Sequence, residues 1–309
     1  MIVRSVKNPA ASIRAQLLAH AKRYGEDYQR ILTRFAIERL LFRLAQTEAS
    51  ANYVLKGAML FATWPEQAFR PTGDLDLLGQ GDSAPSAIAD LFTHICAVDV
   101  PQDGIVFMPE TLAVEVAQEA NRYLGIRLSL KGALDNARIH VQVDIGFGDH
   151  VHPKPTRQTF PSLLPGMPAA SILMYPPETV IAEKFEAMIR FGQANGRIKD
   201  FHDIWVITRS FPLVLSDLIE AVAGTFQRRA TRLPAEMPIG LTNIFAEMAV
   251  TRGLWSGFLR RSPPALSPPP FHELQRELRQ FFGPVIEALS LPARAKAKWD
   301  PNARNWHSP

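Results

Sequence analysis

Two segments of alternating hydrophobicity, separated by a short polar turn, restrict the fold most strongly. From Ile139 to Ile145 every second residue is aliphatic and the residues between them are polar or charged. The segment Gly125 to Lys131 alternates too, and the Asp135-Asn136 pair between them is typical of a hairpin turn. Because side chains of a strand point alternately to its two faces, this pattern predicts an antiparallel hairpin with one apolar and one polar face.

Segments of helical periodicity surround these strands. Apolar residues recur at helical spacing from Ser12 to about Thr47, with Gly25 as a break between two helices, and a further helix is expected from Ser86 to Cys96. After Pro176-Pro177 strand patterns largely disappear. The helices expected beyond that point span Glu178 to Phe191, Phe201 to Phe211, Leu213 to Phe226 and Glu273 to about Leu289.

These patterns predict an α+β fold, in which a small mixed sheet flanked by helices precedes a helical C-terminal domain. We place the sheet and the N-terminal helices in residues 1–170, the helical domain in 171–290, and a basic, loosely ordered tail in 291–309. The single cysteine, Cys96, excludes an intramolecular disulfide and a cysteine-rich zinc site. No apolar run approaches the roughly 18 residues of a membrane span, and no signal pattern opens the chain, so a cytoplasmic location is expected.

A pair of acids marks the strand predicted from Asp74 to Leu78. Asp74 and Asp76 share one face of that strand, where two carboxylates repel each other unless a cation lies between them. Asp144 adds a third acid on the polar face of the hairpin, and carboxylate oxygens are ligands that Mg²⁺ prefers. The alternative is that the acids only cover a solvent-exposed strand face. Nearby, Lys56-Gly57-Ala58 fits a tight strand-to-helix turn that can point N–H groups at a phosphate.

Two charged residues interrupt apolar helix faces in the C-terminal part. Lys184 lies within the apolar stripe of its helix, either as a lysine whose ammonium reaches out to solvent or as a cation that meets a polyphosphate. Asp200 points into the buried face of the next helix, unless it caps that helix or pairs with Arg197, and Lys199 and Asp203 are spaced as a local ion pair. The face opposite Lys184 is expected to carry Thr179, Glu183, Glu186 and Arg190.

Five motifs occur in a fixed order along the chain. They are Lys56-Gly57, Arg70-Pro-Thr72-Gly-Asp74-Leu-Asp76, Asp144-Ile-Gly-Phe-Gly-Asp149, Glu178-Thr-Val-Ile-Ala-Glu-Lys184 and Arg197-Ile-Lys199-Asp200-Phe-His-Asp203. Together they resemble the AbiEii/AbiGii (MenT-like) nucleotidyltransferase toxins of bacterial toxin–antitoxin systems, from about Tyr53 to Trp255. The resemblance implies a DNA polymerase β-like nucleotidyltransferase core, Mg²⁺ (with Mn²⁺ as an alternative), and a nucleotide triphosphate as substrate.

The resemblance also implies roles for individual residues. The metal ligands are Asp74, Asp76 and Asp144; the catalytic residues are these acids with Lys184 and Asp200; the nucleotide-binding residues are Lys56, Gly57, Ala58, Arg70, Thr72, Arg197 and Lys199. Lys184 would neutralise the pyrophosphate leaving group, and Asp200 would orient Lys184 or touch the nucleotide. Contacts to an RNA backbone are expected from Arg228, Arg229, Arg232, Arg260 and Arg261, unless these are plain solvated surface.

The family implies an RNA acceptor, the 3′ end of tRNA in studied members, and a cognate antitoxin that is a winged-helix (AbiEi-like) regulator or a kinase-like protein. In some members the position of Thr72 is phosphorylated by the antitoxin. Where the family has a serine or threonine after its glycine pair, this chain has Gly57-Ala58-Met59, so one phosphate-binding hydroxyl is absent. Two alternatives therefore stand beside the toxin: an aminoglycoside-type adenylyltransferase, and a catalytically silent relative that binds nucleotide or a protein partner.

Overall fold

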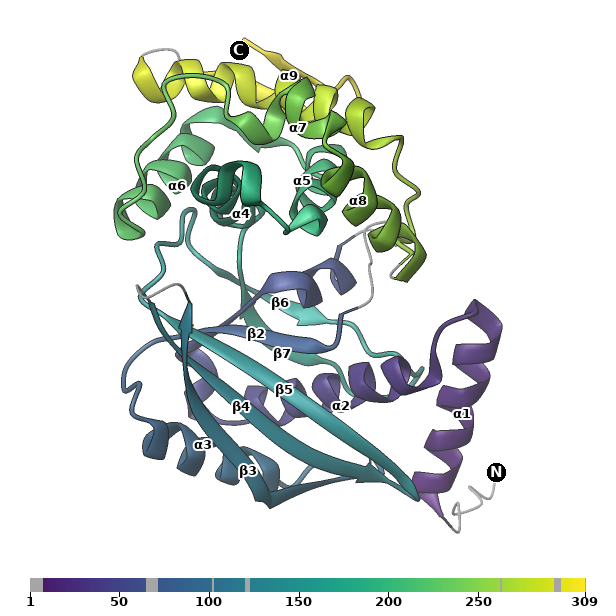
Figure 1. Ribbon diagram of the computed structural model, residues 1–309. Helices are drawn as coiled ribbons and strands as arrows, with labels where there is room; N and C mark the ends of the chain where they lie inside the picture. Colours follow the sequence, from purple (N-terminus) through teal and green to yellow (C-terminus); the bar gives the residue numbers. More distant parts are fainter. Residues whose placement is uncertain are drawn as a thin grey trace. The chain divides into compact units, whose positions relative to one another are not determined.

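The computed structural model describes residues 8–64, 72–101, 103–119, 123–261, 263–291 and 296–308. The chain divides into two compact units (Figure 1). The sheet unit comprises Met1–Thr63, Thr72–Gly148 and Arg157–Met174, and the helical unit comprises Trp64–Pro71, Asp149–Thr156 and Tyr175–Pro309. None of the helices in the described part of the chain combines the length and apolar character needed to cross a bilayer.

A seven-stranded mixed sheet dominates the described residues of the sheet unit, with the strand order β3-β4-β5-β2-β1-β7-β6. The strands are β1 (Tyr53–Lys56), β2 (Asp74–Gly79), β3 (Ile105–Glu119), β4 (Tyr123–Leu134), β5 (Ala137–Phe147), β6 (Thr156–Phe160) and β7 (Ala170–Met174). β4 and β5 form the predicted hairpin, and Asp135 in its turn adopts a φ of 54°. Next to this hairpin, β2 runs parallel to β5 and antiparallel to β1.

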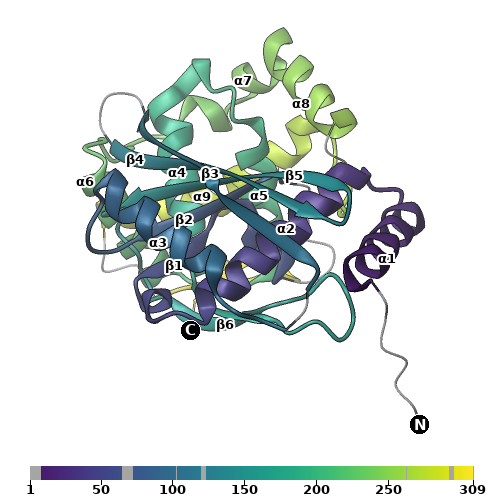
Figure 2. The ribbon, with the colours of Figure 1, turned by 90° about the horizontal axis from the view of Figure 1, so that it is seen from below.

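The two faces of the sheet differ in polarity. Leu75 and Leu77 on β2 lie in register with Val143 and Ile145 on β5, and these four side chains are buried. The helices of this unit are α1 (Pro9–Tyr24), α2 (Tyr28–Ala45) and α3 (Pro85–Ala97). α2 packs against β5 and β7, and α3 packs against β3 and α2, so both helices contribute to the core that covers the sheet (Figure 2). The alternation predicted from the sequence therefore places the acids on the opposite, more polar face.

The sheet is larger than the sequence predicts. β3, β6 and β7 are absent from the prediction, and the reason is clearest for β3. A register shift between Met108 and Ala113 interrupts its pairing with β4, and Pro109 lies inside it, so no single alternating pattern runs through the strand. The helices on either side of Gly25 are confirmed, and Gly25 itself takes the left-handed conformation that ends α1.

The helical unit contains α4 (Pro177–Phe191), α5 (Ile198–Ser210), α6 (Leu215–Arg228), α7 (Asn243–Glu247), α8 (Ala249–Arg261) and α9 (Phe271–Ser290). Its core is rich in aromatic rings: Phe185 of α4 stacks on Phe282 of α9 with ring centroids 4.1 Å apart, and Phe201 of α5 stacks on Phe245 of α7 at 5.6 Å. Such ring pairs add to the stabilisation from apolar burial and lock the helices together.

The end of the chain is not the loosely ordered tail that its basic composition suggests. Lys298–Asp300 (β9) pairs with Asn305–His307 (β10) and with Leu213–Val214 (β8), so α6 begins two residues later than predicted. Trp299 is buried, and its indole N–H donates to the carbonyl of Thr208 at 2.6 Å. Burial of this ring, with its polar atom hydrogen-bonded, anchors the segment to the helical unit.

Candidate active site

A row of charged residues crosses four neighbouring strands of the sheet unit. Register pairs Lys56 of β1 with Asp76 of β2, Asp76 with Asp144 of β5, and Asp144 with Arg127 of β4. Residues paired in this way lie about 4.8 Å apart and share one face of the sheet. The order along the row is therefore cation, acid, acid, cation. We call these four residues the charged row.

Asp74 lies on the same face as the charged row, two residues before Asp76. It is exposed, whereas Asp76 and Asp144 are half-buried. The pairing of Asp74 with Gln142 puts an amide beside it on the next strand. The structure thus brings Asp74, Asp76 and Asp144 together on one face, as the sequence predicts, and like charges placed this way on adjacent strands disfavour the sheet in the absence of a cation.

Arg127 is the site residue that the sequence prediction missed. Its Nε donates to Asp144 Oδ1 at 2.7 Å and its Nη2 donates to Asp144 Oδ2 at 3.0 Å, which is a bidentate ion pair. The amide of Gln142 donates to the same Oδ2 at 3.1 Å. The signal was present in the hairpin: once the turn at Asp135-Asn136 fixes the register, Arg127 must face Asp144.

Gly57 lets the backbone approach Asp76 closely. A Cβ at this position would lie 1.9 Å from Asp76 Oδ2, and the glycine has a φ of +69°, a conformation that other residues rarely adopt. Gly57 opens the short 3-10 helix Gly57–Ala62, so the predicted strand-to-helix turn is present and lies against an acid of the charged row. Met59, at the position of the missing hydroxyl, is buried, as is Ala58 at the second glycine position.

The donor set fits a divalent cation in part. Asp74 and Asp76 supply two carboxylates, and Mg²⁺ sites commonly use one or two carboxylates together with phosphate and water oxygens. Among the described residues, no group of three or more His, Cys, Asp or Glu side chains is arranged to hold a metal ion. Asp144 instead directs both oxygens to Arg127. Arg127 therefore competes with any ion that Asp144 would share with Asp76.

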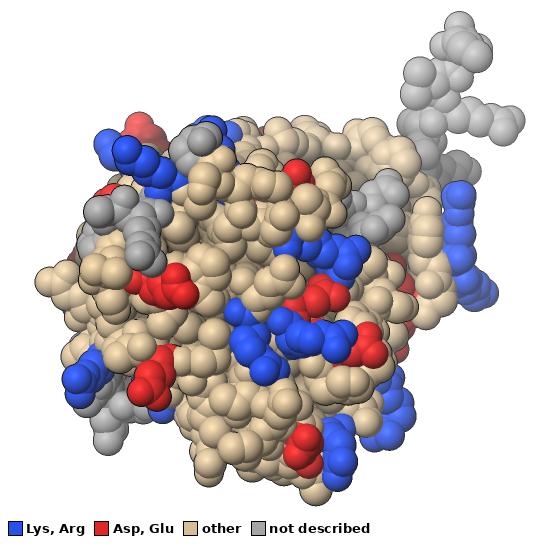
Figure 3. All heavy atoms as spheres, turned by 90° about the horizontal axis from the view of Figure 1, so that it is seen from above, with Lys and Arg blue, Asp and Glu red and all other residues tan. Residues whose placement is uncertain are grey.

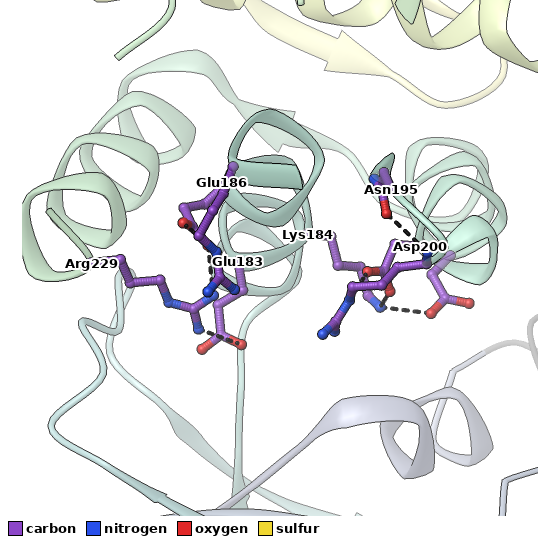
Figure 4. A network of polar contacts seen from close by, with 9 residues as sticks. Glu183, Lys184, Glu186, Asn195, Asp200 and Arg229 are labelled. Carbon is purple, nitrogen blue, oxygen red and sulfur yellow. Dashed lines mark hydrogen bonds and ion pairs between the residues drawn. The ribbon is translucent and has the colours of Figure 1, made fainter. Parts of the chain in front are cut away.

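In the helical unit, Lys184 is held by two aspartates. Its Nζ donates to Asp200 Oδ1 at 2.6 Å and to Asp203 Oδ2 at 2.7 Å, and Arg197 Nε donates to the other oxygen of Asp200 at 2.8 Å (Figure 4). Burial alone would raise the pKa of Asp200, but the charges of Lys184 and Arg197 lower it below the ordinary value. Asp200 therefore contacts Lys184 directly, and its two predicted roles in catalysis stay predictions. Asp203 pairs with Lys184, and its pairing with Lys199 stays a prediction.

On the opposite side of α4, the structure corrects the prediction made for Arg229. Arg229 was a candidate RNA contact, but its guanidinium lies 3.6 Å from Asp149, 3.3 Å from Glu183 and 3.0 Å from Glu186. Figure 4 shows Arg229 and these glutamates on one side of α4 and Lys184 on the other. Glu186 is fully buried, so the face opposite Lys184 is a second packing surface. Burial tends to lower the pKa of Arg229, but the surrounding carboxylates raise it overall.

The remaining predicted residues are placed as follows. Arg70 lies outside the described residues. Thr72 is half-exposed just before β2, Lys199 is exposed at the start of α5, and Arg228, Arg232, Arg260 and Arg261 are exposed. On the face drawn in Figure 3, the described Lys and Arg side chains are interspersed with Asp and Glu and form no continuous basic surface. An RNA contact by these arginines stays a prediction.

Residues 39–277 match the family of the nucleotidyl transferase AbiEii toxin of type IV toxin–antitoxin systems. The chain belongs to this family. It is accordingly a nucleotidyltransferase, and the predicted fold class, a nucleotidyltransferase core followed by a helical C-terminal part, is confirmed. AbiEii proteins are the toxin components of their systems, so a nucleotide substrate and an antitoxin partner follow from membership.

Two solved structures are similar to this chain. JHP933 from Helicobacter pylori is 11% identical with a TM-score of 0.43, and the match covers 86% of this chain and 96% of that one. A second Helicobacter pylori protein, provisionally assigned as a nucleotidyltransferase, is 12% identical with a TM-score of 0.43, over 86% of this chain and 98% of that one. No curated protein matches the sequence.

Proposed function

We propose that this AbiEii protein transfers a nucleoside monophosphate from a nucleotide triphosphate to the 3′ end of tRNA, in a Mg²⁺-dependent reaction, and thereby blocks translation. The observation that carries the proposal is the register of Asp76 beside Asp144, with Asp74 on the same face and Gly57 against Asp76. When bound, Mg²⁺ would neutralise phosphate charge and lower the barrier to in-line displacement.

The residues of the sheet unit have distinct roles in this reaction. Asp74 and Asp76 would hold the cation that binds the triphosphate, and Lys56, beside Asp76 in the charged row, adds a positive charge for the phosphates. Asp144 accepts the proton of the attacking hydroxyl. A new bond then forms between the acceptor oxygen and the α-phosphorus, the bond to the β-phosphate oxygen breaks, and pyrophosphate leaves.

Lys184 supplies the charge that the leaving pyrophosphate needs. An ammonium with two carboxylate partners is held in one place, so it loses little freedom when a phosphate approaches. Asp200 and Asp203 act through Lys184 and are positioning residues. The absence of a hydroxyl at Met59 leaves the N–H groups of the turn and the charged row as the phosphate-binding groups of the sheet unit.

Labelled triphosphates test the proposal. The protein is incubated with each α-labelled nucleotide, Mg²⁺ and either total RNA or the small-molecule fraction of a bacterial lysate. We expect label in tRNA and none without Mg²⁺. Label in a small molecule would instead support an aminoglycoside-type enzyme, and nucleotide binding without transfer would support a silent relative. Either of these two results contradicts the proposal.

The biological setting can be tested separately. We propose that a neighbouring gene encodes the antitoxin, either an AbiEi-like regulator or a kinase-like protein. Expression of the chain alone should arrest growth, and co-expression of the neighbour should restore it. A kinase-like antitoxin would add a dianion at Thr72, close to the acids of β2, and so repel the metal-bound triphosphate. Mass spectrometry of the co-expressed protein distinguishes the two antitoxin types.

A further inference from the structure

The ion pair between Arg127 and Asp144 poses a problem for the proposed chemistry. Asp144 is needed beside Asp76, yet three hydrogen bonds turn its carboxylate toward Arg127 and Gln142. A carboxylate offers about four lone-pair positions, so these donors occupy most of its capacity. A fixed Arg127 would therefore compete with any cation for Asp144.

The ion pair between Arg127 and Asp144 is accessible to solvent, so Asp144 can exchange Arg127 for another cation at small cost. The side chain of Arg127 is 47% exposed and that of Asp144 is 28% exposed. Ion pairs this accessible contribute little to stability, because solvent screens them and both side chains lose freedom in forming them. The helical unit shows the contrast: Lys184 is 12% exposed and its partner Asp203 is 0% exposed. Of these two ion pairs, the one in the sheet can open at small cost.

The charged row gives this pair two alternative arrangements. With Asp144 turned to Arg127, its negative charge is drawn away from Asp76 and the repulsion within the row is relieved. With a divalent cation between Asp76 and Asp144, attraction replaces that repulsion, and the positive charge of Arg127 next to the cation becomes unfavourable. The same acid is therefore stabilised by one cation or by the other.

We propose that Arg127 is an internal counter-ion that occupies Asp144 until a divalent cation binds, and that it then turns to the triphosphate. This inference rests on the proposed function, because it assigns the cation and the triphosphate to the same face of the sheet. A guanidinium suits the second position, since its planar array of donors matches phosphate oxygens. Arg127 becomes a residue that sets the order of binding, with the cation before the nucleotide.

The experiment measures two affinities that Arg127 should move in opposite directions. Mn²⁺ binding without nucleotide is measured by calorimetry for the wild type and for Arg127→Gln. We expect the variant to bind Mn²⁺ about three- to tenfold more tightly, because a competing positive charge is gone. Inorganic tripolyphosphate is then titrated into each Mn²⁺-saturated protein, where we expect about tenfold weaker binding by the variant.

Lys131→Gln is the matched control. Lys131 is exposed on the same strand and the same face as Arg127, about 13 Å along the chain, and its register partner is His140 rather than an acid. The control should leave both affinities unchanged. In an Asp144→Asn background, Arg127→Gln should no longer tighten Mn²⁺ binding, because the residue for which it competes is neutral.

The outcomes separate this inference from the proposed function. Equal Mn²⁺ affinity in the wild type and Arg127→Gln, or weaker binding by the variant, overturns the counter-ion role while the proposed function stands. Tighter Mn²⁺ binding with unchanged tripolyphosphate affinity overturns the move to the triphosphate. If no protein in the set binds Mn²⁺, the metal-dependent function fails and this inference fails with it.

Discussion

The charged side chains of the sheet unit and those of the helical unit are built in opposite ways. On the sheet, Asp76 and Asp144 lie side by side in register and are half-buried, with Asp74 exposed next to them. In the helical unit, Lys184 and Arg229 each lie among carboxylates, two of which, Asp203 and Glu186, are fully buried. In the first region acids are direct neighbours on an accessible face, and in the second each cation lies among buried or partly buried carboxylates.

This difference predicts which substitutions lower the stability of the fold and which lower its activity. Removing one member of a buried, matched ion pair leaves an uncompensated charge and should destabilise the fold. Removing one of several crowded acids relieves repulsion and should leave the fold intact. We therefore expect substitutions on the sheet to abolish activity without a loss of stability, and substitutions at Arg229 to reduce stability first.

The largest effect is expected from Asp74→Ala. In the proposed function Asp74 helps to hold the metal-bound triphosphate, so its loss should reduce nucleotide transfer at least about a thousandfold. The melting temperature should be no lower than that of the wild type, because the removed charge is exposed and repelled by its neighbour. Transfer of labelled nucleotide and thermal unfolding of the same preparation measure both quantities. If Asp74→Ala retained its activity, the acids of the sheet would not be needed for transfer, and the contrast between the two units would be wrong.

Arg229→Ala tests whether the ion pairs of the helical unit stabilise the fold. The substitution leaves Glu186 buried beside Arg190 and removes the cation from Asp149 and Glu183. We expect a loss of about 3–5 kcal/mol in the free energy of unfolding, measured with urea. Arg228→Ala is the control at the neighbouring, exposed arginine and should change stability by less than about 0.5 kcal/mol. Equal effects of the two substitutions would show that the buried network is not structural.

Gly57→Ala tests whether the close approach of the backbone at Gly57 sets the position of Asp76. A methyl group has no room beside Asp76, and the positive φ adds strain of about 1–3 kcal/mol. Gly57→Ala should therefore lose stability by about that amount and lose most of its transfer activity as Asp76 moves. Gly73→Ala, where a Cβ would meet nothing within 4 Å, provides the control. Normal activity in Gly57→Ala would mean that the position of Asp76 is not critical.

The smallest expected effect is on the way the free energy of unfolding depends on pH. Since the pKa of Asp200 is lower in the folded protein than in the unfolded chain, its ion pair stabilises the fold above the unfolded value of about 4. That stabilisation is lost as the pH falls further, toward the folded value. Below about pH 4 the free energy of unfolding should decrease more steeply for the wild type than for Asp200→Asn. Parallel pH profiles would show that Asp200 is not held by Lys184 and Arg197.

The sequence predicted the sheet hairpin, the main helices and the shared face of the three acids because each depends on local patterns. Alternation in β5 determined which residues share a face with Asp144, and the Asp-x-Asp spacing placed Asp74 and Asp76 together. Arg127 was missed because its partner is chosen by strand pairing, which the pattern of either strand alone does not show.

The error at Arg229 has a different cause. Helical periodicity correctly put Glu183 and Glu186 opposite Lys184, but it gave no partner for that polar face. That face is covered by Arg229 at the end of α6, which brings a cation to the buried glutamates. Whether a charged residue faces water or a partner depends on tertiary packing, which periodicity does not report.

The most direct test asks whether the neighbouring acids on this sheet bind a divalent cation. Mn²⁺ is titrated by calorimetry into the wild type and into the Asp74→Ala/Asp76→Ala variant. We predict that the wild type binds the ion and that the variant, although folded, does not. Equal binding by both proteins would place the ion elsewhere and contradict the account.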